Sequence, residues 1–273
     1  MPVSPKTRRP IYIMEPMCGL CNRLRAIDGL QGLLERNPGR AHVIWYADAD
    51  LNCRFTDLFH PLPEPFRFWH FSLSPRIEQV FKNLLHAIMK RSCNVYILQH
   101  ETERLVKKGC DFYDITAKGS VFIKTWDCVR KPDAPFALFR PLPHIQSLID
   151  AQIGRYSHTV GVHIRRTDCN QAIALSTTDK FVAAMQAELE AKPETTFFLA
   201  TDDPNEEAQM NRLFPRKILT YQKRTRDRNR KEGIEDAVVD LYCLGACSHV
   251  LGSATSSFSE TAMTISNRLG RYV

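Results

Sequence analysis

The second half of the chain alternates short apolar runs with segments whose apolar residues recur at helical spacing. This alternation is typical of a parallel sheet with helices on both faces. We expect strands at 159–164, 196–200, 217–220 and 249–251, and helices at 178–191, 205–213, 235–246 and 257–267.

The first half begins in a similar way, with a strand at 11–14, a glycine-containing turn, a helix at 22–35 and a strand at 43–46. Three prolines between 135 and 143 make 136–143 an extended connector. We therefore expect an α/β protein of two lobes, with an N-terminal lobe at 1–145 and a C-terminal lobe at 146–273.

A further helix is predicted at 77–89, where the apolar residues fall on one helical face and basic residues lie elsewhere. We expect this face to pack on the core of the N-terminal lobe. The alternative is a surface that docks on a membrane.

The composition is that of an ordinary globular protein, with 273 residues of which 44% are hydrophobic and 25% charged. A net charge of +7 favours an anionic partner, which could be a nucleic acid, a membrane surface or a phosphate-bearing small molecule. No apolar run approaches the roughly 20 residues of a membrane span, and no signal-peptide pattern is present. We therefore expect a cytoplasmic protein whose nine cysteines are reduced thiols.

Polar residues gather where the strands of the C-terminal lobe end. Ligands of parallel α/β sheets bind beyond the carboxyl ends of the strands. Arg165 and Arg166 are adjacent at such an end, so one side chain should face the crevice and the other its wall. A guanidinium group matches the geometry of a pyrophosphate.

Two other strand ends carry candidate ligand-binding residues. Four hydroxyl side chains beside Gly252 precede a helix and, together with its backbone amides, can seat an anion: Ser253, Thr255, Ser256 and Ser257. Simple helix capping is the alternative for any one of them. Of Asp202 and Asp203, one should cap the helix that begins at Pro204, and the other can orient an arginine or a ribose hydroxyl.

The segments His163-Ile-Arg-Arg-Thr-Asp168, Ala200-Thr-Asp-Asp-Pro204, Val239-Asp-Leu and Thr255-Ser-Ser, in this order, resemble those of the α1,6-fucosyltransferases of N-glycan cores and nodulation factors. In the first half, Gly19-Leu-Cys-Asn-Arg-Leu-Arg25 looks like the Gly-x-x-Asn-x-x-Arg loop of the wider fucosyltransferase superfamily, which is a less specific match.

The resemblance implies a GT-B-like fold of two Rossmann-like lobes and inverting transfer of fucose from GDP-fucose to a glycan hydroxyl, without a metal ion or another cofactor. It implies a nucleotide sugar and a glycan or glycolipid acceptor as partners, leaves peripheral membrane contact open, and gives no reason to expect a nucleic acid. When no metal is present, arginines must stabilise the charge that develops on the departing diphosphate.

The resemblance also assigns roles to individual residues. Arg165 and Arg166 would hold the pyrophosphate and act in catalysis with Asp168, and His163 and Asp240 would contact the nucleoside. The phosphates would meet Ser256 with its neighbours Thr255 and Ser257, and Asp202 and Asp203 would support the site. In the N-terminal lobe, Asn22, Arg23 and Arg25 would line the cleft and face the acceptor.

The chain also departs from the family. Cys169 stands where the α1,6-enzymes carry a lysine, and Ile173 stands where they carry a glutamate that is a proposed base. The base would then be Asp168, Glu260 or a carboxylate of the N-terminal lobe. A different nucleotide-sugar donor, or a degenerate protein that binds glycans or nucleotides without catalysis, is the competing hypothesis.

Three other patterns have competing interpretations. Asp48-Ala-Asp50 has the D-x-D form of metal-dependent transferases, and Cys18 and Cys21 with Cys243 and Cys247 would give a four-thiolate site. We expect neither to bind a metal. The basic segment 223–231 is either a solvated mobile loop or a lid over an anionic substrate.

Overall fold

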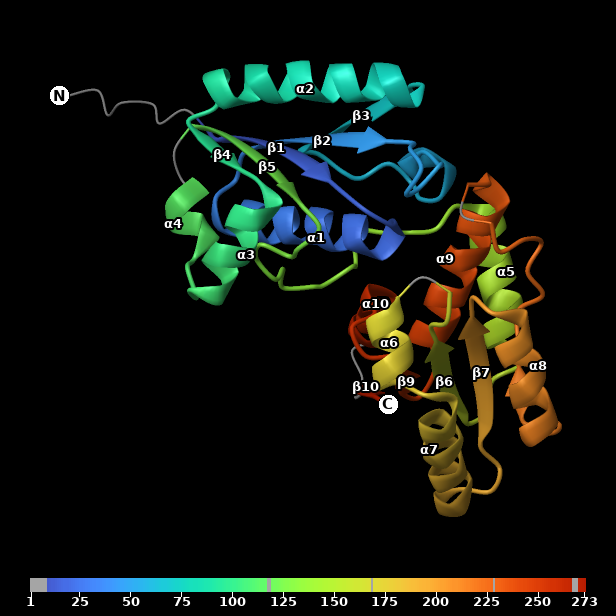
Figure 1. The fold of residues 1–273 in the computed structure, drawn as a ribbon. Helices are drawn as coiled ribbons and strands as arrows, with labels where there is room; N and C mark the ends of the chain where they lie inside the picture. Colours follow the sequence, from blue (N-terminus) through green and yellow to red (C-terminus); the bar gives the residue numbers. More distant parts are fainter. Residues whose placement is uncertain (1–8, 117–118, 168, 228, 267–269) are drawn as a thin grey trace. The chain divides into compact units, whose positions relative to one another are not determined.

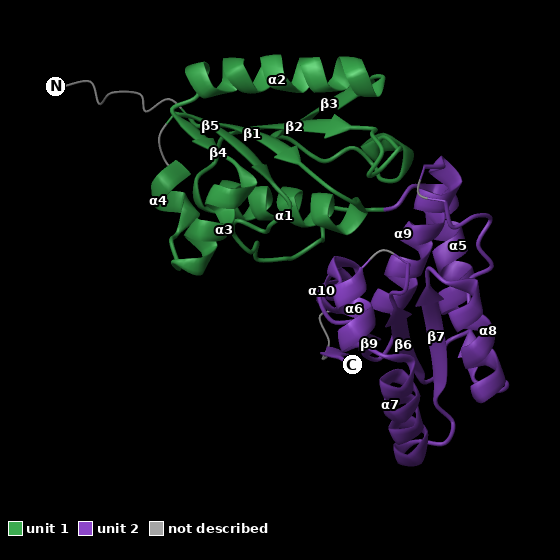
Figure 2. Ribbon diagram, viewed as in Figure 1, with its two compact units in different colours: residues 1–140 green, residues 141–273 purple. Residues whose placement is uncertain are grey.

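The structure is a computed structural model that describes residues 9–116, 119–167, 169–227, 229–266 and 270–273. The chain forms two compact units, Met1–Arg140 and Pro141–Val273, which are coloured separately in Figure 2. The boundary between the units falls after Arg140, inside the connector predicted at 136–143. Helix α5 (Pro143–Ile153) is the first helix of the second unit.

The described part of unit 1 is built on a five-stranded parallel sheet with the order β3-β2-β1-β5-β4. Its strands are β1 (Ile11–Pro16), β2 (Arg40–Tyr46), β3 (Phe66–Phe71), β4 (Val95–Ile97) and β5 (Ser120–Thr125). Parallel neighbours need crossover connections, so helices lie on both faces of the sheet (Figure 1). One face carries α2 (Pro75–Ser92), and the other carries α1 (Leu20–Arg36), α3 (Gln99–Lys107) and α4 (Phe112–Thr116). A short 3₁₀ turn, η1 (Phe55–Asp57), follows β2.

Helix α2 forms where it was predicted, but the expectation that its apolar residues share one core-packed face is wrong. One row packs against the sheet and consists of Phe81, Leu85 and Met89. A second row is exposed to solvent and consists of Ile77, Val80, Leu84 and Ile88. The apolar residues surround more of the helix than one sheet face can cover.

The described part of unit 2 is a second five-stranded parallel sheet, with the order β10-β9-β6-β7-β8. Its strands are β6 (Thr159–Ile164), β7 (Thr196–Thr201), β8 (Ile218–Leu219), β9 (Val250–Gly252) and β10 (Gly270–Tyr272). Besides α5, the helices are α6 (Asn170–Leu175), α7 (Thr178–Ala191), α8 (Pro204–Leu213), α9 (Lys231–Gly245) and α10 (Ser257–Ser266). The predicted parallel sheet with flanking helices is confirmed.

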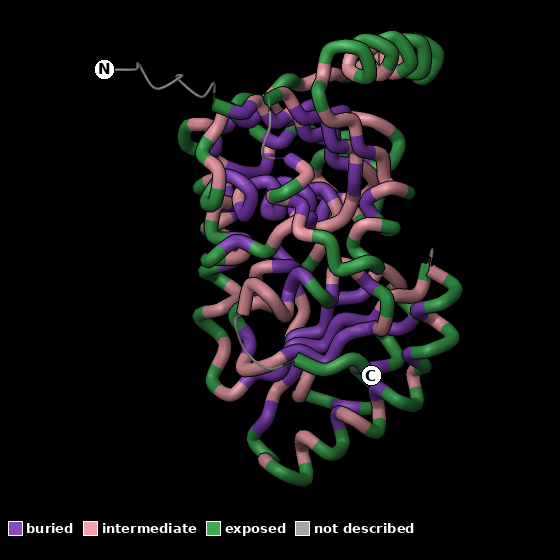
Figure 3. The backbone as a smooth tube through the Cα atoms, turned by 90° about the vertical axis from the view of Figure 1, so that its left-hand side faces the viewer, coloured by how far each residue is buried: buried purple, intermediate pink, exposed green. Residues whose placement is uncertain are grey.

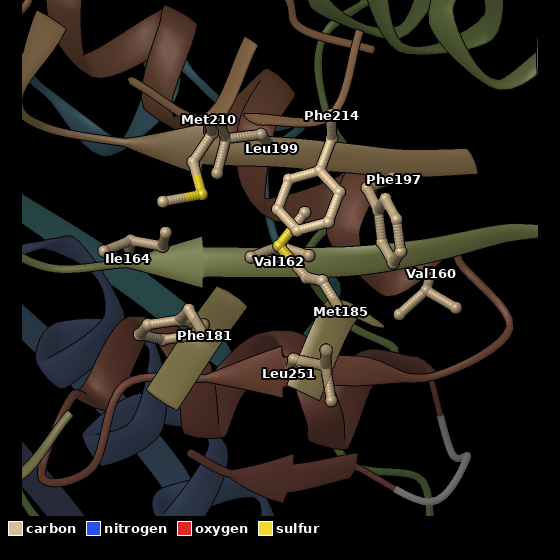
Figure 4. Packing of buried hydrophobic residues seen from close by; sticks show 10 residues of the cluster. All are labelled: Val160, Val162, Ile164, Phe181, Met185, Phe197, Leu199, Met210, Phe214 and Leu251. Atoms are coloured by element: carbon tan, nitrogen blue, oxygen red, sulfur yellow. The ribbon is translucent and has the colours of Figure 1, made fainter. Parts of the chain in front are cut away.

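Strand β6 lies at the centre of this sheet and is buried on both faces. On one face, side chains of β6, β7 and β9 pack against those of α7 and α8 (Figure 4), in a cluster formed by Val160, Val162, Ile164, Phe181, Met185, Phe197, Leu199, Met210, Phe214 and Leu251. On the other face α9 approaches Gly161 so closely that an added Cβ would lie 3.1 Å from Cδ2 of Leu244. The ends of β6, β7 and β9 are therefore held by a dense core.

No helix of the described residues combines the length and the apolarity needed to cross a membrane.

Candidate functional site

The two arginines that follow β6 have different surroundings. The guanidinium group of Arg166 donates hydrogen bonds to the Ser176 carbonyl at 3.0 Å, to Thr178 Oγ1 at 3.2 Å and to Glu206 at 3.1 Å. It is about nine-tenths buried and is part of the wall made by α7 and α8. Arg165 is more exposed, at 21%, and its Nε lies 3.3 Å from Asp202. Arg165 is therefore the arginine that is better placed to meet a ligand.

The two aspartates that follow β7 divide their tasks as the sequence predicts. Asp203 caps α8 by accepting a hydrogen bond from the backbone N–H of Asn205 at 2.8 Å. Asp202 instead accepts from the backbone N–H of Arg166 at 2.8 Å and from the hydroxyl of Thr167 at 2.7 Å, besides its ion pair with Arg165. It thereby fixes the loop after β6.

The hydroxyl-rich segment after β9 joins this loop. Ser253 Oγ accepts a hydrogen bond from the backbone N–H of Arg165 at 2.9 Å and donates one to the His163 carbonyl at 3.2 Å. Thr255 has a left-handed backbone with φ of 58°, and Ser256 Oγ accepts from the Ser259 N–H at 3.4 Å. Ser256 thus caps α10, which begins at Ser257. The structure brings the ends of β6, β7 and β9 together at the start of a helix, an arrangement that suits an anion.

His163 lies beneath this loop and is buried. Its Nδ1 lies 2.7 Å from Ser259 Oγ, and its ring stacks on Phe258 with centroids 4.7 Å apart. Burial, helped by the charge of Arg165, lowers the pKa of His163 to about 3. The ring is therefore neutral near pH 7 and serves as a hydrogen-bonding platform rather than as a cation.

Asp240, on α9, forms a buried ion pair with Lys223 at 2.9 Å. Burial raises the pKa of Asp240 to about 6, although Lys223 acts in the opposite direction. The ion pair engages Asp240 Oδ2, and the buried Oδ1 has no hydrogen-bond partner among the described residues. Such atoms are costly to bury unless a ligand satisfies them.

The basic segment 223–231 is largely exposed where the structure describes it, and several of its cations are paired with acids of unit 2. Besides Lys223, its Arg224 binds the buried carboxylate of Asp236 through Nε at 2.9 Å and through a terminal nitrogen at 2.7 Å. Arg226 pairs with Glu207. Because these counter-charges come from α8 and α9, the described part of the segment is tied to unit 2.

In unit 1, Arg23 is buried and each of its three nitrogens donates a hydrogen bond inside the unit. Nε reaches the Cys18 carbonyl at 2.6 Å, one terminal nitrogen reaches the Tyr46 carbonyl, and the other reaches Asp48 at 2.7 Å. Arg25 is partly exposed and donates from Nε to the Trp126 carbonyl at 2.9 Å and from a terminal nitrogen to Asn22 at 3.2 Å. Arg23 therefore ties the start of α1 to the ends of β1 and β2, and Asn22 and Arg25 of the same helix are less buried.

The D-x-D pair has a structural explanation. The Asp48 carboxylate accepts from Arg23 and from the backbone N–H of Asp50 at 3.1 Å, and it lies 3.5 Å from Lys82. Among the described residues, no three His, Cys, Asp or Glu side chains are grouped to hold a metal ion. Cys243 is buried, which raises its pKa to about 12, as expected for a thiol that packs as a small hydrophobe.

Of the three kinds of candidate base, Asp168 lies outside the described residues. Glu260 is exposed in the first turn of α10. Cys169 and Ile173, where the family carries lysine and glutamate, lie immediately before and within α6, and Cys169 Sγ is 3.9 Å from Thr255 Oγ1.

Sequence reasoning did not single out Glu206 or Lys223 as partners of site residues. Glu206 neutralises Arg166, and it stands three residues after the capping Asp203. That spacing is a capping-box signal, and it could have marked Glu206 as an ordered side chain. Lys223 was grouped with the basic segment, and its pairing with Asp240, 17 positions along the chain, has no local signal.

No protein-family model and no curated protein matches the chain. Solved structures do match. The α1,6-fucosyltransferase NodZ co-crystallised with GDP has a TM-score of 0.65 at 19% identity, over 94% of this chain and 92% of that one. The chain has the fold of the fucosyltransferases.

Two further structures agree with this assignment of the fold. Fucosyltransferase NodZ from Bradyrhizobium has a TM-score of 0.63 at 18% identity, over 94% of this chain and 93% of that one. POFUT1 in complex with GDP-fucose has a TM-score of 0.54 at 10% identity, over 96% and 97% of the two chains. The GT-B-like fold that the sequence motifs implied is thus confirmed, and at these identities the similarity concerns the fold.

Proposed function

We propose that the chain is a glycosyltransferase that binds GDP-fucose in unit 2 and transfers fucose, with inversion and without a metal ion, to a glycan hydroxyl. The observation that carries the proposal is the junction of three strand ends, where Asp202 and Ser253 hold the Arg165 loop beside the start of α10. Its support from outside the chain is that NodZ and POFUT1, which share the fold, were crystallised with GDP and GDP-fucose.

The proposed chemistry follows from charge. Cleavage of the bond between sugar and phosphate leaves a diphosphate whose growing negative charge requires fixed positive groups. Arg165 and the backbone amides at the start of α10, with Thr255, Ser256 and Ser257, supply such groups. Arg166 is already neutralised by Glu206, so its task is to hold the loop in place.

The nucleoside would lie near the buried polar atoms of His163 and Asp240. A guanine ring presents N–H donors along its Watson–Crick edge, and Asp240 Oδ1 is an acceptor that the described residues leave unsatisfied. Uracil has one such N–H and would use this carboxylate less fully. A purine nucleotide is therefore the preferred donor in our proposal.

The first experiment is calorimetric titration with GDP, GDP-fucose, GDP-mannose and UDP in the presence of EDTA. We expect GDP to bind under these conditions and GDP-fucose to bind more tightly than GDP-mannose. Binding that requires Mn²⁺, or a preference for UDP, would contradict the proposal. Preference for GDP-mannose would favour the competing hypothesis of another donor on the same scaffold.

The second competing hypothesis is a binding protein without catalysis, and its basis is Ile173 in place of the family's glutamate. Slow hydrolysis of GDP-fucose in the absence of an acceptor distinguishes an enzyme from such a protein. The base is assigned by comparing Asp168→Asn with Glu260→Gln. The variant that lowers transfer to an acceptor and keeps the wild-type affinity for GDP has lost the base, and if neither does, the base belongs to unit 1.

On this proposal unit 1 faces the acceptor through Asn22 and Arg25, while Arg23 holds the start of their helix, α1, in place. Asn22→Ala is then expected to raise the KM for the acceptor and to leave GDP affinity unchanged. A location in the cytoplasm is part of the same proposal, and fractionation of the native cells tests it.

A further inference from the structure

We propose that the outer face of α2 docks the protein on a membrane surface that carries anionic lipids. This inference concerns unit 1 and does not depend on the proposed transferase activity.

The outer face of α2 is apolar along its length. Its exposed row has fractional exposures between 47% and 69%, and consists of Ile77, Val80, Leu84 and Ile88. Their spacing of three, four and four residues places them along one side of a helix. Among the described residues, nine large apolar side chains are exposed, and these four are the largest group on one element. Figure 3 shows the exposed outer side of α2 at the edge of the unit.

The packing of the inner side shows that this exposure is a property of the helix and not of a poorly packed element. The neighbouring row, Phe81, Leu85 and Met89, lies about 100° further round the helix and is seated on the sheet against Ile44, Tyr46 and Phe122. Lys82 and His86 of the same inner side are tied to Glu78 and to Glu15 of β1, at 2.5 and 2.8 Å. Helix α2 is therefore fixed on the sheet by its inner side, and its outer row cannot turn inward.

The charges of the outer side have one sign. Arg76, Lys90 and Arg91 are exposed, and the single acid of the helix, Glu78, is largely buried against Lys82. An exposed apolar row on a helix whose exposed charges are all cations is the pattern of a helix that lies in the interface of an anionic bilayer. A protein groove that accepted this ridge would need to offer acids beside an apolar channel, whereas a lipid surface offers both without a matched shape.

The face of the sheet that carries α2 has a further exposed aromatic residue at its edge. Trp69, on the edge strand β3, is the register partner of Ile44 and therefore lies on the face of the sheet that α2 covers. Its ring is 54% exposed, and Arg67, two residues earlier on the same face, is exposed as well. Tryptophan beside arginine is favoured at the boundary between headgroups and acyl chains.

The test is flotation of the full chain with vesicles of phosphatidylcholine alone and with vesicles that also contain phosphatidylserine. We expect binding to the anionic vesicles that weakens as salt is raised. The Leu84→Glu variant should lower the partition coefficient by about tenfold or more, because a leucine that leaves water is replaced by a charge of the wrong sign. The matched control is Leu213→Glu on α8 of unit 2, where the leucine is exposed to 49% and the partition coefficient should not change.

A double variant separates the contribution of charge from that of apolar contact. The combined changes Lys90→Glu and Arg91→Glu should abolish the preference for anionic vesicles while the chain stays folded, since both side chains are exposed. Calorimetry with GDP should give the same affinity for these variants as for the wild type, so failure of docking and failure of the proposed function are distinguishable.

Three results would overturn the proposal. The first is equal flotation of the wild type and Leu84→Glu, and the second is no flotation of either at low salt. The third is a dimer, detected by light scattering, that Leu84→Glu dissociates while vesicles bind neither protein. The outer face of α2 would then be covered by a second copy of the chain.

Discussion

Asp202 offers the most direct test of how the Arg165 loop is organised. Its carboxylate accepts from the backbone N–H groups of Arg166 and Thr167, at 2.8 and 3.3 Å, from the Thr167 hydroxyl at 2.7 Å, and it pairs with Arg165 at 3.3 Å. In Asp202→Asn the amide can retain one acceptor oxygen toward Arg166. The second polar group of the amide is an uncharged NH₂, which would face hydrogen-bond donors in place of the carboxylate oxygen.

The cost can be worked out from these contacts. Hydrogen bonds to charged groups contribute about 1.5–3 kcal/mol each. The Thr167 hydroxyl can rotate to accept from the new NH₂ group, so two contacts are lost, those with the Thr167 N–H and with Arg165. Because the Asp202 side chain is 20% exposed, we discount each of these two contacts to about 1 kcal/mol. If the loop must be ordered before a diphosphate binds, the loss of about 2 kcal/mol appears as GDP binding that is about 30-fold weaker.

The assay is calorimetric titration of GDP in EDTA, with Asp203→Asn as the matched control. Asparagine caps helices as well as aspartate does, so the same change one residue later should leave both stability and affinity near the wild-type values. A GDP affinity for Asp202→Asn within about twofold of the wild type would refute the argument. Equal losses in the two variants would refute it as well, since Asp203 only caps α8.

Three further variants test the site and the two cores. Arg165→Ala should abolish transfer with the circular dichroism spectrum unchanged, and turnover above about a tenth of the wild-type value would contradict its catalytic role. Burial raises the pKa of Asp28 from 3.8 to about 7, so charging it costs folded-state free energy and stability falls as pH rises between these values. Urea unfolding at pH 8 should therefore show Asp28→Asn to be more stable than the wild type, by up to about 4 kcal/mol, with the difference vanishing near pH 3. Lys223→Met should cost about 3 kcal/mol, because Asp240 would be left as a buried charge without its partner. Recovery of thermal stability in the double variant with Asp240→Asn checks this, and a single variant as stable as the wild type would contradict it.

The sequence predicted the helices and strands of unit 2 better than those of unit 1, because the turn residues that bound them are local signals. The strand at 159–164 and the helix at 178–191 form with the predicted bounds, because each apolar period is bracketed by turn residues. In unit 1, β3, β4 and β5 were not predicted. Strand β3 lies at the sheet edge and carries Arg67 and His70 among its aromatic residues, so it lacks a clean alternation.

The location of the candidate site was predictable because it lies at strand ends, and the sequence indicates where the strands of unit 2 end. The loop after β6 and the Asp-Asp-Pro cap followed from chain position and helix chemistry. The tasks of Arg166 and Arg23 did not, because an arginine that faces a ligand and one that is buried against carbonyls have the same sequence signal. The ion pairs of the basic segment did not follow from the sequence for a related reason. Its counter-charges Asp236 and Glu235 lie on the following helix, and pairing across a turn depends on tertiary packing.

The absence of a side chain at Gly161 lets α9, the helix that carries Asp240, pack closely on β6. Leu244, which blocks the place of a Cβ at Gly161, stands one helical turn after Asp240 on the same helix. A methyl group at position 161 would therefore require Leu244 to give way by a few tenths of an ångström, and the strain would fall on α9. If Asp240 contacts the nucleobase as proposed, a substitution at Gly161 would act on that contact through the packing of α9 and without touching the ligand.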